Sequence, residues 1–228
     1  MKPSVLVCCE FSGTVRDAFA RLGADAWSCD LLPTESPGQH IQGDALVALR
    51  SRPWNLVISH PPCTYLCSSG QHWTTRGLRD PQHTEDALTF VQAFMEADCP
   101  RVAIENPVGV ISTRIRKPDQ IIQPYSYGHD ASKGTCLWIR GLPKLKPTEY
   151  VPPRRACKRC KAVSRVQDLQ ACPSCALAGA WFLPRWSNQT DSGQNKLGPS
   201  ADRWALRSVT YPGIAAAMAS QWTGELSK

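Results

Sequence analysis

The sequence predicts an α/β fold in which an open sheet carries helices on both faces. Short apolar runs rich in β-branched residues alternate along the chain with segments of helical periodicity, as in strand–helix–strand units. Four of these runs are followed by a carboxylate or a cysteine, a pattern typical of ligand-binding α/β sheets. The length of 228 residues suits one such domain with a small insertion.

The first part of the chain supplies three of the expected strands. The predicted elements are strands over residues 5–9, 24–29 and 54–60, with helices over 15–22 and from Asp44 to residue 51. Between the first strand and the first helix lies a tight turn with glycine, where backbone N–H groups at the helix start are available to a ligand. Pro61 and Pro62 end the third strand, because neither can donate a ladder hydrogen bond.

The remaining chain supplies a long helix, another buried strand and a pair of strands that closes one edge of the sheet. The expected order is a helix capped by Thr84, a strand over 101–104, edge strands over 121–127 and 135–139, and two helical pieces from residue 202 broken at 211–213. Between residues 64 and 81 we expect a long loop.

Four chemically useful side chains follow predicted strands. They are Glu10, Asp30, Cys63 and Glu105. Ligands of open α/β sheets bind outside the carboxyl ends of the strands, so all four are expected to face one crevice. Asp30 stands where a carboxylate can accept hydrogen bonds from ribose hydroxyl groups.

Cys63 is the candidate nucleophile. It is the first residue after the Pro61-Pro62 stop, and a rigid lead-in of this kind suits a side chain that must be aimed. The competing interpretation is a small buried hydrophobic residue, the commonest role of a free cysteine. The flanking carboxylates favour the catalytic interpretation.

The predicted loop after Cys63 is rich in aromatic and basic residues. These are His72, Trp73, Arg76 and Arg79. Next to a candidate nucleophile, such a loop suits a cover that stacks on a base and meets phosphate. The alternative is a solvated surface loop.

The composition favours a polyanionic partner and a reducing environment. The formal net charge is +7, and the chain contains 11 cysteines. The short apolar run near the N-terminus does not resemble a signal peptide, and no stretch approaches the roughly 20 apolar residues of a membrane span. We therefore expect a cytoplasmic protein, without a membrane partner, whose cysteines are metal ligands or catalytic groups.

Two Cys-x-x-Cys knuckles predict a structural metal site. Cys157 and Cys160 form the first, Cys172 and Cys175 the second, with 11 residues between them. Four thiolates at this spacing can surround one Zn²⁺ tetrahedrally, and such a closed site is structural. An iron–sulfur centre or an unmetallated cluster are the alternatives.

Basic residues surround the first knuckle. They are Arg154, Arg155, Lys158, Arg159, Lys161 and Arg165. The functional interpretation is a module that binds phosphates. The alternative is that these cations offset the negative charge of a four-thiolate zinc centre.

With these residues in place, the chain resembles the cytosine-5 DNA methyltransferases, and more closely their small phage-type members. The likeness follows chain order over residues 1–140 and 203–222. The matching segments are Phe11-Ser12-Gly13, Asp30, Gly43-Asp44, Pro61-Pro62-Cys63, Glu105-Asn106-Pro107 and the C-terminal Tyr211-Pro212-Gly213-Ile214-Ala215. The resemblance implies a Rossmann-like methyltransferase sheet with a small zinc-ribbon-like insertion.

The resemblance also implies roles for these residues. Cys63 and Glu105 are the implied catalytic residues. The implied contacts to S-adenosylmethionine come from Phe11, Ser12, Gly13, Asp30, Asp44 and Pro61. The implied domains are a catalytic domain over 1–150, a zinc-knuckle insertion over 151–182 and a C-terminal segment over 183–228 that returns to the catalytic domain.

The implied reaction is methyl transfer to the 5-position of cytosine in DNA, duplex with a flipped base or single-stranded. A thiolate that adds to the 6-carbon makes the 5-carbon nucleophilic, and Glu105 stabilises the charge at the 3-nitrogen. If a phage encodes the chain, the location is the host cytoplasm. Two alternatives stay open, namely the same chemistry on a free cytosine nucleotide and a non-catalytic zinc-containing nucleic-acid-binding protein.

Overall fold

The computed structural model describes residues 2–166, 168–190, 192–198, 200 and 203–226. The chain folds as two compact units. The first unit contains Met1–Ile122, Gly134–Lys146 and Val209–Lys228, and the second contains Gln123–Lys133 and Pro147–Ser208. The predicted division into 1–150, 151–182 and 183–228 is a division by function and stays a prediction. No helix in the described ranges is long and apolar enough to cross a lipid bilayer.

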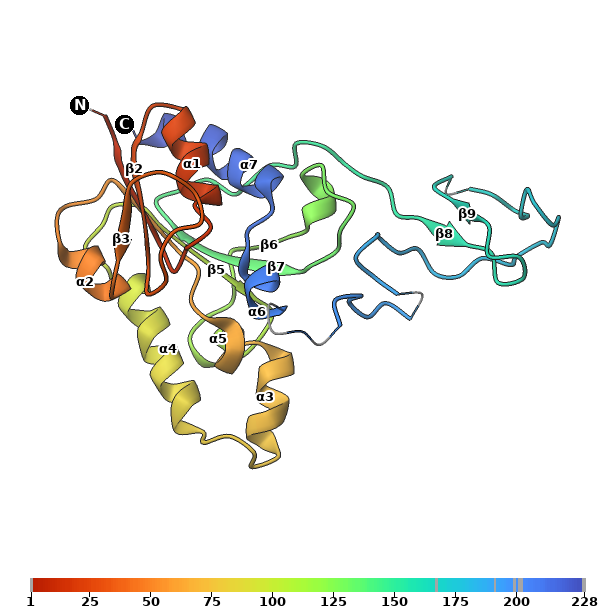
Figure 1. The fold of residues 1–228 in the computed structure, drawn as a ribbon, viewed down its shortest axis with the longest axis horizontal. Coiled ribbons are helices and arrows are strands. Elements are labelled where there is room, and N and C mark those ends of the chain that lie inside the picture. Colours follow the sequence, from red (N-terminus) through yellow and green to blue (C-terminus); the bar gives the residue numbers. More distant parts are fainter. Residues whose placement is uncertain (1, 167, 191, 199, 201–202, 227–228) are drawn as a thin grey trace. The chain divides into compact units, whose positions relative to one another are not determined.

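A seven-stranded sheet forms the centre of the first unit (Figure 1). Its spatial order is β3-β2-β1-β4-β5-β7-β6. The strands are β1 Ser4–Cys8, β2 Asp25–Asp30, β3 His40–Gln42, β4 Leu56–Ser59, β5 Val102–Pro107, β6 Gln120–Ile122 and β7 Thr135–Arg140. The first five are mutually parallel, and β7 runs antiparallel to both β5 and β6. This architecture confirms the predicted fold class.

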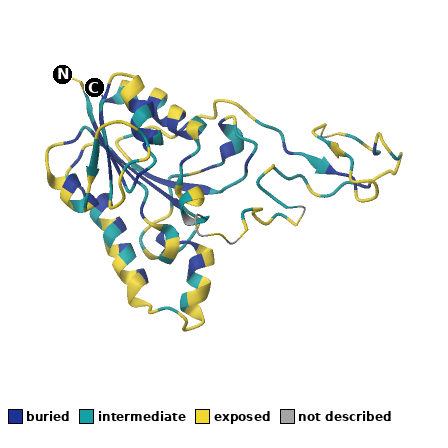
Figure 2. Cartoon of the chain, viewed as in Figure 1, coloured by how far each residue is buried: buried dark blue, intermediate teal, exposed yellow. Residues whose placement is uncertain are grey.

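Helices cover both faces of the sheet. On one face α1 (Thr14–Arg21) packs against α7 (Pro212–Trp222), and these two helices lie side by side in Figure 1. On the other, α2 (Ala45–Arg50) and α4 (Gln82–Met95) pack on a core of β-strand side chains. Figure 2 shows the consequence, with buried strands between helices that are buried on one side and exposed on the other. The two faces of the sheet are thus both covered by helices.

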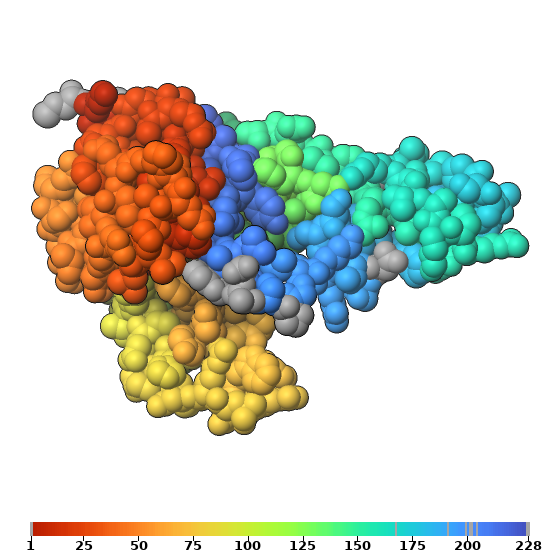
Figure 3. Space-filling view, viewed as in Figure 1, coloured from red at the N-terminus to blue at the C-terminus, as the bar shows by residue number. Residues whose placement is uncertain are grey.

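The segment after Cys63 is not the long loop that the sequence predicts. It contains the 3-10 helix η1 (Cys63–Tyr65) and the helix α3 (Ser68–Thr75). Gly70 permits this compaction, because a Cβ atom there would lie 2.0 Å from the Thr64 carbonyl oxygen. Figure 3 shows α3 and the turn that leads to α4 projecting from the body of the unit.

The prediction that Thr84 caps the long helix is wrong. Helix α4 begins at Gln82, and Asp80 Oδ1 accepts a hydrogen bond of 2.9 Å from the Gln82 N–H. Thr84 lies inside the helix and is buried, and its hydroxyl accepts a hydrogen bond from Gln71 Nε2. Asp80 and Pro81, which directly precede the helix, therefore set its start.

The predicted strand over 121–127 is shorter than expected. β6 ends at Ile122, and η2 (Pro124–Ser126) follows, because Pro124 has no N–H to continue a ladder. β6 nevertheless pairs with β7 and closes the edge of the sheet as predicted.

The remaining elements include the two predicted C-terminal helices, whose bounds agree with the sequence to within a few residues, and short helices that the sequence did not predict. After β5 comes the short helix α5 (Ile111–Arg114), and near the C-terminus α6 (Arg203–Ser208) precedes α7 and η3 (Thr223–Glu225). The break between the two C-terminal helices lies at 209–211, and Pro212 opens α7, where its missing N–H costs nothing. Residue 202, where the sequence predicts the first piece to begin, lies outside the described residues.

The second unit contains little regular structure. β8 (Arg155–Ala156) pairs with β9 (Val163–Ser164) in an antiparallel hairpin around the first knuckle. Its small buried cluster contains Cys157, Cys172 and Ala180. With so few buried apolar groups, this unit depends on other stabilising interactions.

Candidate functional site

The carboxyl ends of four parallel strands bring the predicted site residues to one edge of the sheet. The register places Cys8 of β1 beside Cys29 of β2 and Ser59 of β4, and Ser59 beside Ile104 of β5. Glu10, Asp30, Cys63 and Glu105 lie at or just beyond these positions. The sheet topology thus places the four residues at one edge of the sheet, and their convergence on one crevice stays a prediction.

The turn after β4 is rigid and presents Cys63. Pro61 is buried, Pro62 is exposed, and Cys63 is half-buried at the first position of η1. The Cys63 carbonyl oxygen accepts hydrogen bonds from the N–H groups of Leu66 (3.1 Å) and Cys67 (2.9 Å). These two hydrogen bonds restrain the backbone that follows Cys63, and the two prolines restrain the backbone that precedes it.

Side chains tie this turn to the end of β5. His60 Nδ1 lies 2.8 Å from Glu105 Oε2, and the Asn106 side-chain N–H donates to the Pro61 carbonyl oxygen at 2.7 Å. Asn106 is 1% exposed, so this amide bond is shielded from water. A buried hydrogen bond that cannot be exchanged for water is costly to break, and it holds the Cys63 and Glu105 segments in fixed register.

The segments that follow are tied as well. The Val110 N–H donates to the Leu66 carbonyl oxygen at 2.9 Å, and the Ser68 N–H donates to the Val108 carbonyl oxygen at 3.1 Å. A Cβ atom at Gly109 would lie 1.9 Å from the Leu66 carbonyl oxygen. The two backbones thus approach so closely that only glycine fits.

Cys63 is more accessible than its neighbour Cys67. Cys67 is buried, and its sulfur lies 3.2 Å from the Ser69 hydroxyl. Other cysteines at this edge are protonated at neutral pH, since burial raises the pKa of the Cys8 and Cys9 thiols and raises that of Cys29 to about 11. Cys63 and Cys9 are the two half-buried thiols of this group, and the raised pKa of Cys9 makes it the poorer nucleophile.

A pocket of about 150 Å³ adjoins the cysteine turn. It is lined by Cys9, Asp30, Leu31, Gly43, Asp44, Ala45, Pro62 and Phe90. Two carboxylates and several apolar side chains thus meet in one cavity, and Pro62 connects that cavity to Cys63. A planar heterocycle with hydroxyl and amino donors matches this lining.

Both carboxylates of the pocket are held in place. Asp44 Oδ1 accepts hydrogen bonds from the N–H groups of Leu46 (2.6 Å) and Val47 (3.3 Å), so Asp44 caps α2. Asp30 Oδ1 accepts from the Leu32 N–H at 3.0 Å. In both aspartates the hydrogen bonds from backbone N–H groups go to the same carboxylate oxygen, Oδ1.

Phe90 and Leu31 are pocket residues that sequence reasoning missed. Phe90 belongs to α4, where it is partly buried against the hydrophobic core and also lines the pocket. Leu31 carried no signal in the sequence, because an exposed leucine after a strand is common.

The turn after β1 differs from the expectation of a free helix start. Glu10 is buried, and its carboxylate accepts hydrogen bonds from the N–H groups of Val15 (2.5 Å) and Arg16 (3.1 Å). Burial raises the pKa of the Glu10 carboxyl, although the hydrogen bonds from the Val15 and Arg16 N–H groups act in the opposite direction. The Glu10 carboxylate therefore binds the N–H groups at the start of α1 that the sequence suggested were available to a ligand.

Not all predicted cofactor contacts reach the 150 Å³ pocket. Within the described chain, Asp30 and Asp44 line it, whereas Phe11, Ser12, Gly13 and Pro61 do not. Gly13 has φ 73° at the start of α1, and a Cβ atom there would lie 2.3 Å from Arg16 Nη2. The glycine is thus required by the packing of Arg16.

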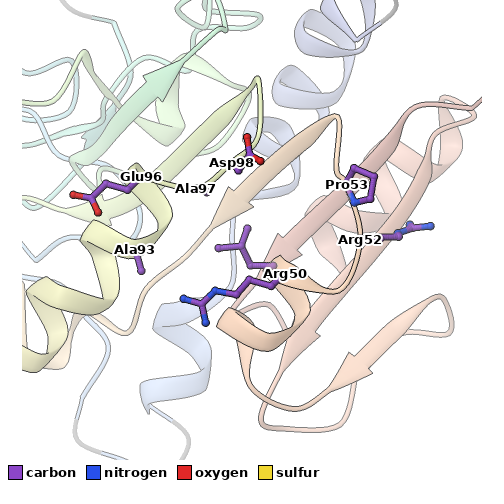
Figure 4. A pocket seen from close by; sticks show the side chains of 8 residues that line it. Arg50, Arg52, Pro53, Ala93, Glu96, Ala97 and Asp98 are labelled. Atoms are coloured by element: carbon purple, nitrogen blue, oxygen red, sulfur yellow. The ribbon is translucent and has the colours of Figure 1, made fainter.

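A larger pocket of about 670 Å³ lies away from the predicted residues. Its lining comes from the C-terminal ends of α2 and α4 and the loops that follow, including Arg50, Arg52, Glu96 and Asp98 (Figure 4). These loops lead into the amino ends of β4 and β5. Ligands of parallel sheets bind at the opposite, carboxyl edge, which favours the smaller pocket as the functional one.

The four knuckle cysteines come together as the sequence predicts. Their sulfur atoms all lie within 4.8 Å of one another, with Cys157–Cys175 and Cys160–Cys172 each at 3.6 Å. A tetrahedral site with zinc–sulfur bonds of about 2.3 Å has sulfurs about 3.8 Å apart. The donor set therefore fits a four-thiolate metal centre.

The two knuckles share one backbone geometry. Lys161 N–H donates to the Cys157 carbonyl oxygen and Ala176 N–H to that of Cys172, with φ values of 62° and 56° at the two donors. Backbone N–H groups, first that of Cys160, lower the pKa of the Cys157 thiol to about 6, which favours a thiolate ligand.

The basic residues of this unit fall into two groups. Arg154 donates to the Gln189 carbonyl oxygen, and Arg165 pairs with Asp130, so both hold the unit together. Lys158, Arg159 and Lys161 are exposed beside the first knuckle. Of the six basic residues around the first knuckle, these three are exposed and suited to contact a phosphate, whereas Arg155 is half-buried.

Purified protein is expected to contain one zinc ion per chain. The Cys160→Ser variant should lose this metal, because a serine hydroxyl is a poor substitute for a thiolate. Elemental analysis after gel filtration measures the stoichiometry, with Cys99→Ser as a control outside the cluster. A fully folded wild-type protein without metal would contradict the assignment.

No sequence-family model matches the chain. No curated protein matches it either. Two solved structures are similar to this chain. One is of a protein described as a DNA modification methyltransferase encoded within a prophage (E. coli), with a sequence identity of 15% and a TM-score of 0.42. The other is of the Entamoeba histolytica methyltransferase EhMeth, with a sequence identity of 14% and a TM-score of 0.45. The matches cover 67% and 66% of this chain but only 53% and 58% of those chains, just over half of their length. Similarity at this level does not distinguish one activity from another.

Proposed function

We propose that the chain is an S-adenosylmethionine-dependent enzyme that methylates the 5-position of cytosine in DNA through a covalent Cys63 adduct. The observation that carries this proposal is the tie between the ends of β4 and β5. Asn106 holds the turn before Cys63, and the next segments are locked at Gly109. This tie supports a site in which the Cys63 thiol and the Glu105 carboxyl act on one base, beside a pocket with two further carboxylates.

The 150 Å³ pocket fits the adenosyl part of the cofactor. Asp30 would accept hydrogen bonds from ribose hydroxyl groups, and Asp44 would accept from the adenine amino group. Leu31 and Phe90 supply apolar surface for the ring. Bound there, S-adenosylmethionine supplies an electrophilic methyl group. The implied contacts from Phe11, Ser12, Gly13 and Pro61 are part of this proposal, although these residues lie outside the pocket.

The reaction needs a nucleophile and a general acid that act on the same cytosine ring. The Cys63 thiolate adds to the 6-carbon of cytosine, and Glu105 donates a proton or hydrogen bond to the 3-nitrogen as charge develops on the ring. The 5-carbon then carries the new methyl group. A water molecule acts as the base that removes the proton from the 5-carbon, the electron pair of that C–H bond restores the 5,6 double bond, and the thiolate leaves the 6-carbon, so the cysteine is regenerated.

The proposed substrate is a cytosine flipped from duplex DNA or held in a single strand. Flipping costs a few kcal/mol, which a side chain that fills the gap can offset. Trp73 of α3 is 47% exposed and lies in the projecting segment that follows Cys63. It offers a flat face for this purpose.

We further propose that the four-cysteine cluster holds a structural zinc ion and that residues 1–150 form the catalytic domain. None of the 11 cysteines, all of which lie in the described residues, is joined in a disulfide. A cytoplasmic location, that of the host if a phage encodes the chain, would keep them reduced.

Cys63→Ala is expected to abolish methyl transfer while cofactor affinity changes less than about threefold. Alanine keeps the turn but removes the nucleophile, so the loss should exceed about 1,000-fold. Incorporation of labelled methyl groups into DNA and calorimetry with S-adenosylmethionine measure the two quantities. Cys67→Ala is the matched control and should stay active. Loss of activity in the control alone would make Cys67 the nucleophile.

Replacement of Lys158, Arg159 and Lys161 by glutamine is expected to weaken binding to all DNA sequences alike. Each lost phosphate contact reduces the slope of log affinity against log salt by about 0.9. Arg21, Lys144 and Lys146 provide a control of equal charge, because all three are exposed in the first unit. An unchanged slope in a folded, metal-loaded variant would contradict a phosphate-binding role and favour charge compensation of the thiolates.

A further inference from the structure

His60 lies between two buried carboxyl groups. It follows β4, which stands between β1 and β5 in the sheet, so Glu10 flanks it on one side and Glu105 on the other. The His60 side chain is 7% exposed, and its Nδ1 lies 2.8 Å from Glu105 Oε2. Sequence reasoning assigned no role to this residue.

The other charged groups of this region leave the His60–Glu105 contact intact. Arg16 directs its guanidinium to the Ser28 hydroxyl and to the carbonyl oxygens of Ser36 and Pro37, away from His60. Burial raises the pKa of the Cys136 thiol on the neighbouring strand β7, so this thiol is uncharged. His60 is a basic group in direct contact with Glu105.

The second ring nitrogen of His60 indicates which tautomer is present. Within the described structure, Nε2 is buried and has no hydrogen-bond partner. A buried N–H without an acceptor costs more than a buried lone pair, so the proton belongs on Nδ1. Nδ1–H then donates to Glu105 Oε2 and marks that oxygen as the acceptor of the carboxyl group.

We propose that His60 is a positioning residue for Glu105 in the proposed reaction. Because Nδ1–H holds Oε2, the acidic proton of the Glu105 carboxyl resides on Oε1. As the Cys63 thiolate forms its bond to the 6-carbon, this proton passes from Oε1 to the 3-nitrogen of cytosine. The resulting carboxylate keeps the hydrogen bond from Nδ1–H, and the proton returns to Oε1 when the thiolate leaves. This inference rests on the proposed function.

Two amide variants test the role without the loss of polarity. The side-chain nitrogen of asparagine can take the place of Nδ1, whereas that of glutamine takes the place of Nε2. His60→Asn is expected to keep kcat within about tenfold of wild type. His60→Gln should lower kcat by about 100-fold, within the range for general acid catalysis, with KM for DNA and cofactor affinity nearly unchanged.

A double-mutant cycle distinguishes positioning from a general structural effect. If His60 acts only through Glu105, then His60→Gln should cost nothing further in a Glu105→Gln background. The inference would be overturned, while the proposed function stands, by any of three results. The reductions in kcat could be additive in the double variant, the two His60 variants could have equal kcat, or His60→Gln could keep the wild-type kcat. A folded wild-type protein without methyl transfer to DNA would overturn the proposed function and this inference together.

Discussion

The short hydrogen bonds between the ends of β4 and β5 are the interaction on which the site depends. Neither Pro61 nor Pro62 has an N–H, so the backbone after β4 cannot be held by an ordinary ladder. Asn106 replaces the missing ladder contact by donating its side-chain amide to the Pro61 carbonyl oxygen. The proline pair stiffens the turn, and the asparagine fixes where that stiff turn points.

The pocket and the reactive edge are joined through the same turn. Pro62 lines the 150 Å³ cavity, and Cys63 follows it directly. The carboxylates on the far side of the cavity come from the ends of β2 and α2, where each also fixes local backbone. A group bound in this cavity would therefore meet residues whose positions are determined before binding, which reduces the entropic cost of assembling the site.

The sequence allowed the sheet and its carboxyl edge to be predicted, because buried β-branched runs and their terminal residues have strong local signals. It did not allow the α3 helix to be predicted, since that helix depends on Gly70 fitting against the Thr64 carbonyl oxygen, a tertiary contact. The prediction that Thr84 caps the long helix was wrong because Asp80 accepts the hydrogen bond from the first residue of that helix, Gln82. His60, Phe90 and the capping role of Glu10 emerged only from spatial neighbours that lie far apart in the chain.

The most direct test of the central claim is covalent trapping by DNA that contains 5-fluorocytosine. Fluorine at the 5-carbon cannot leave as a cation, so after methyl transfer the Cys63 bond to the 6-carbon should persist. With S-adenosylmethionine present, we expect a denaturant-resistant protein–DNA adduct, located by peptide mass spectrometry at Cys63 and missing in Cys63→Ala. Wild-type protein that methylates DNA without any adduct, or an adduct at another residue, would contradict the account.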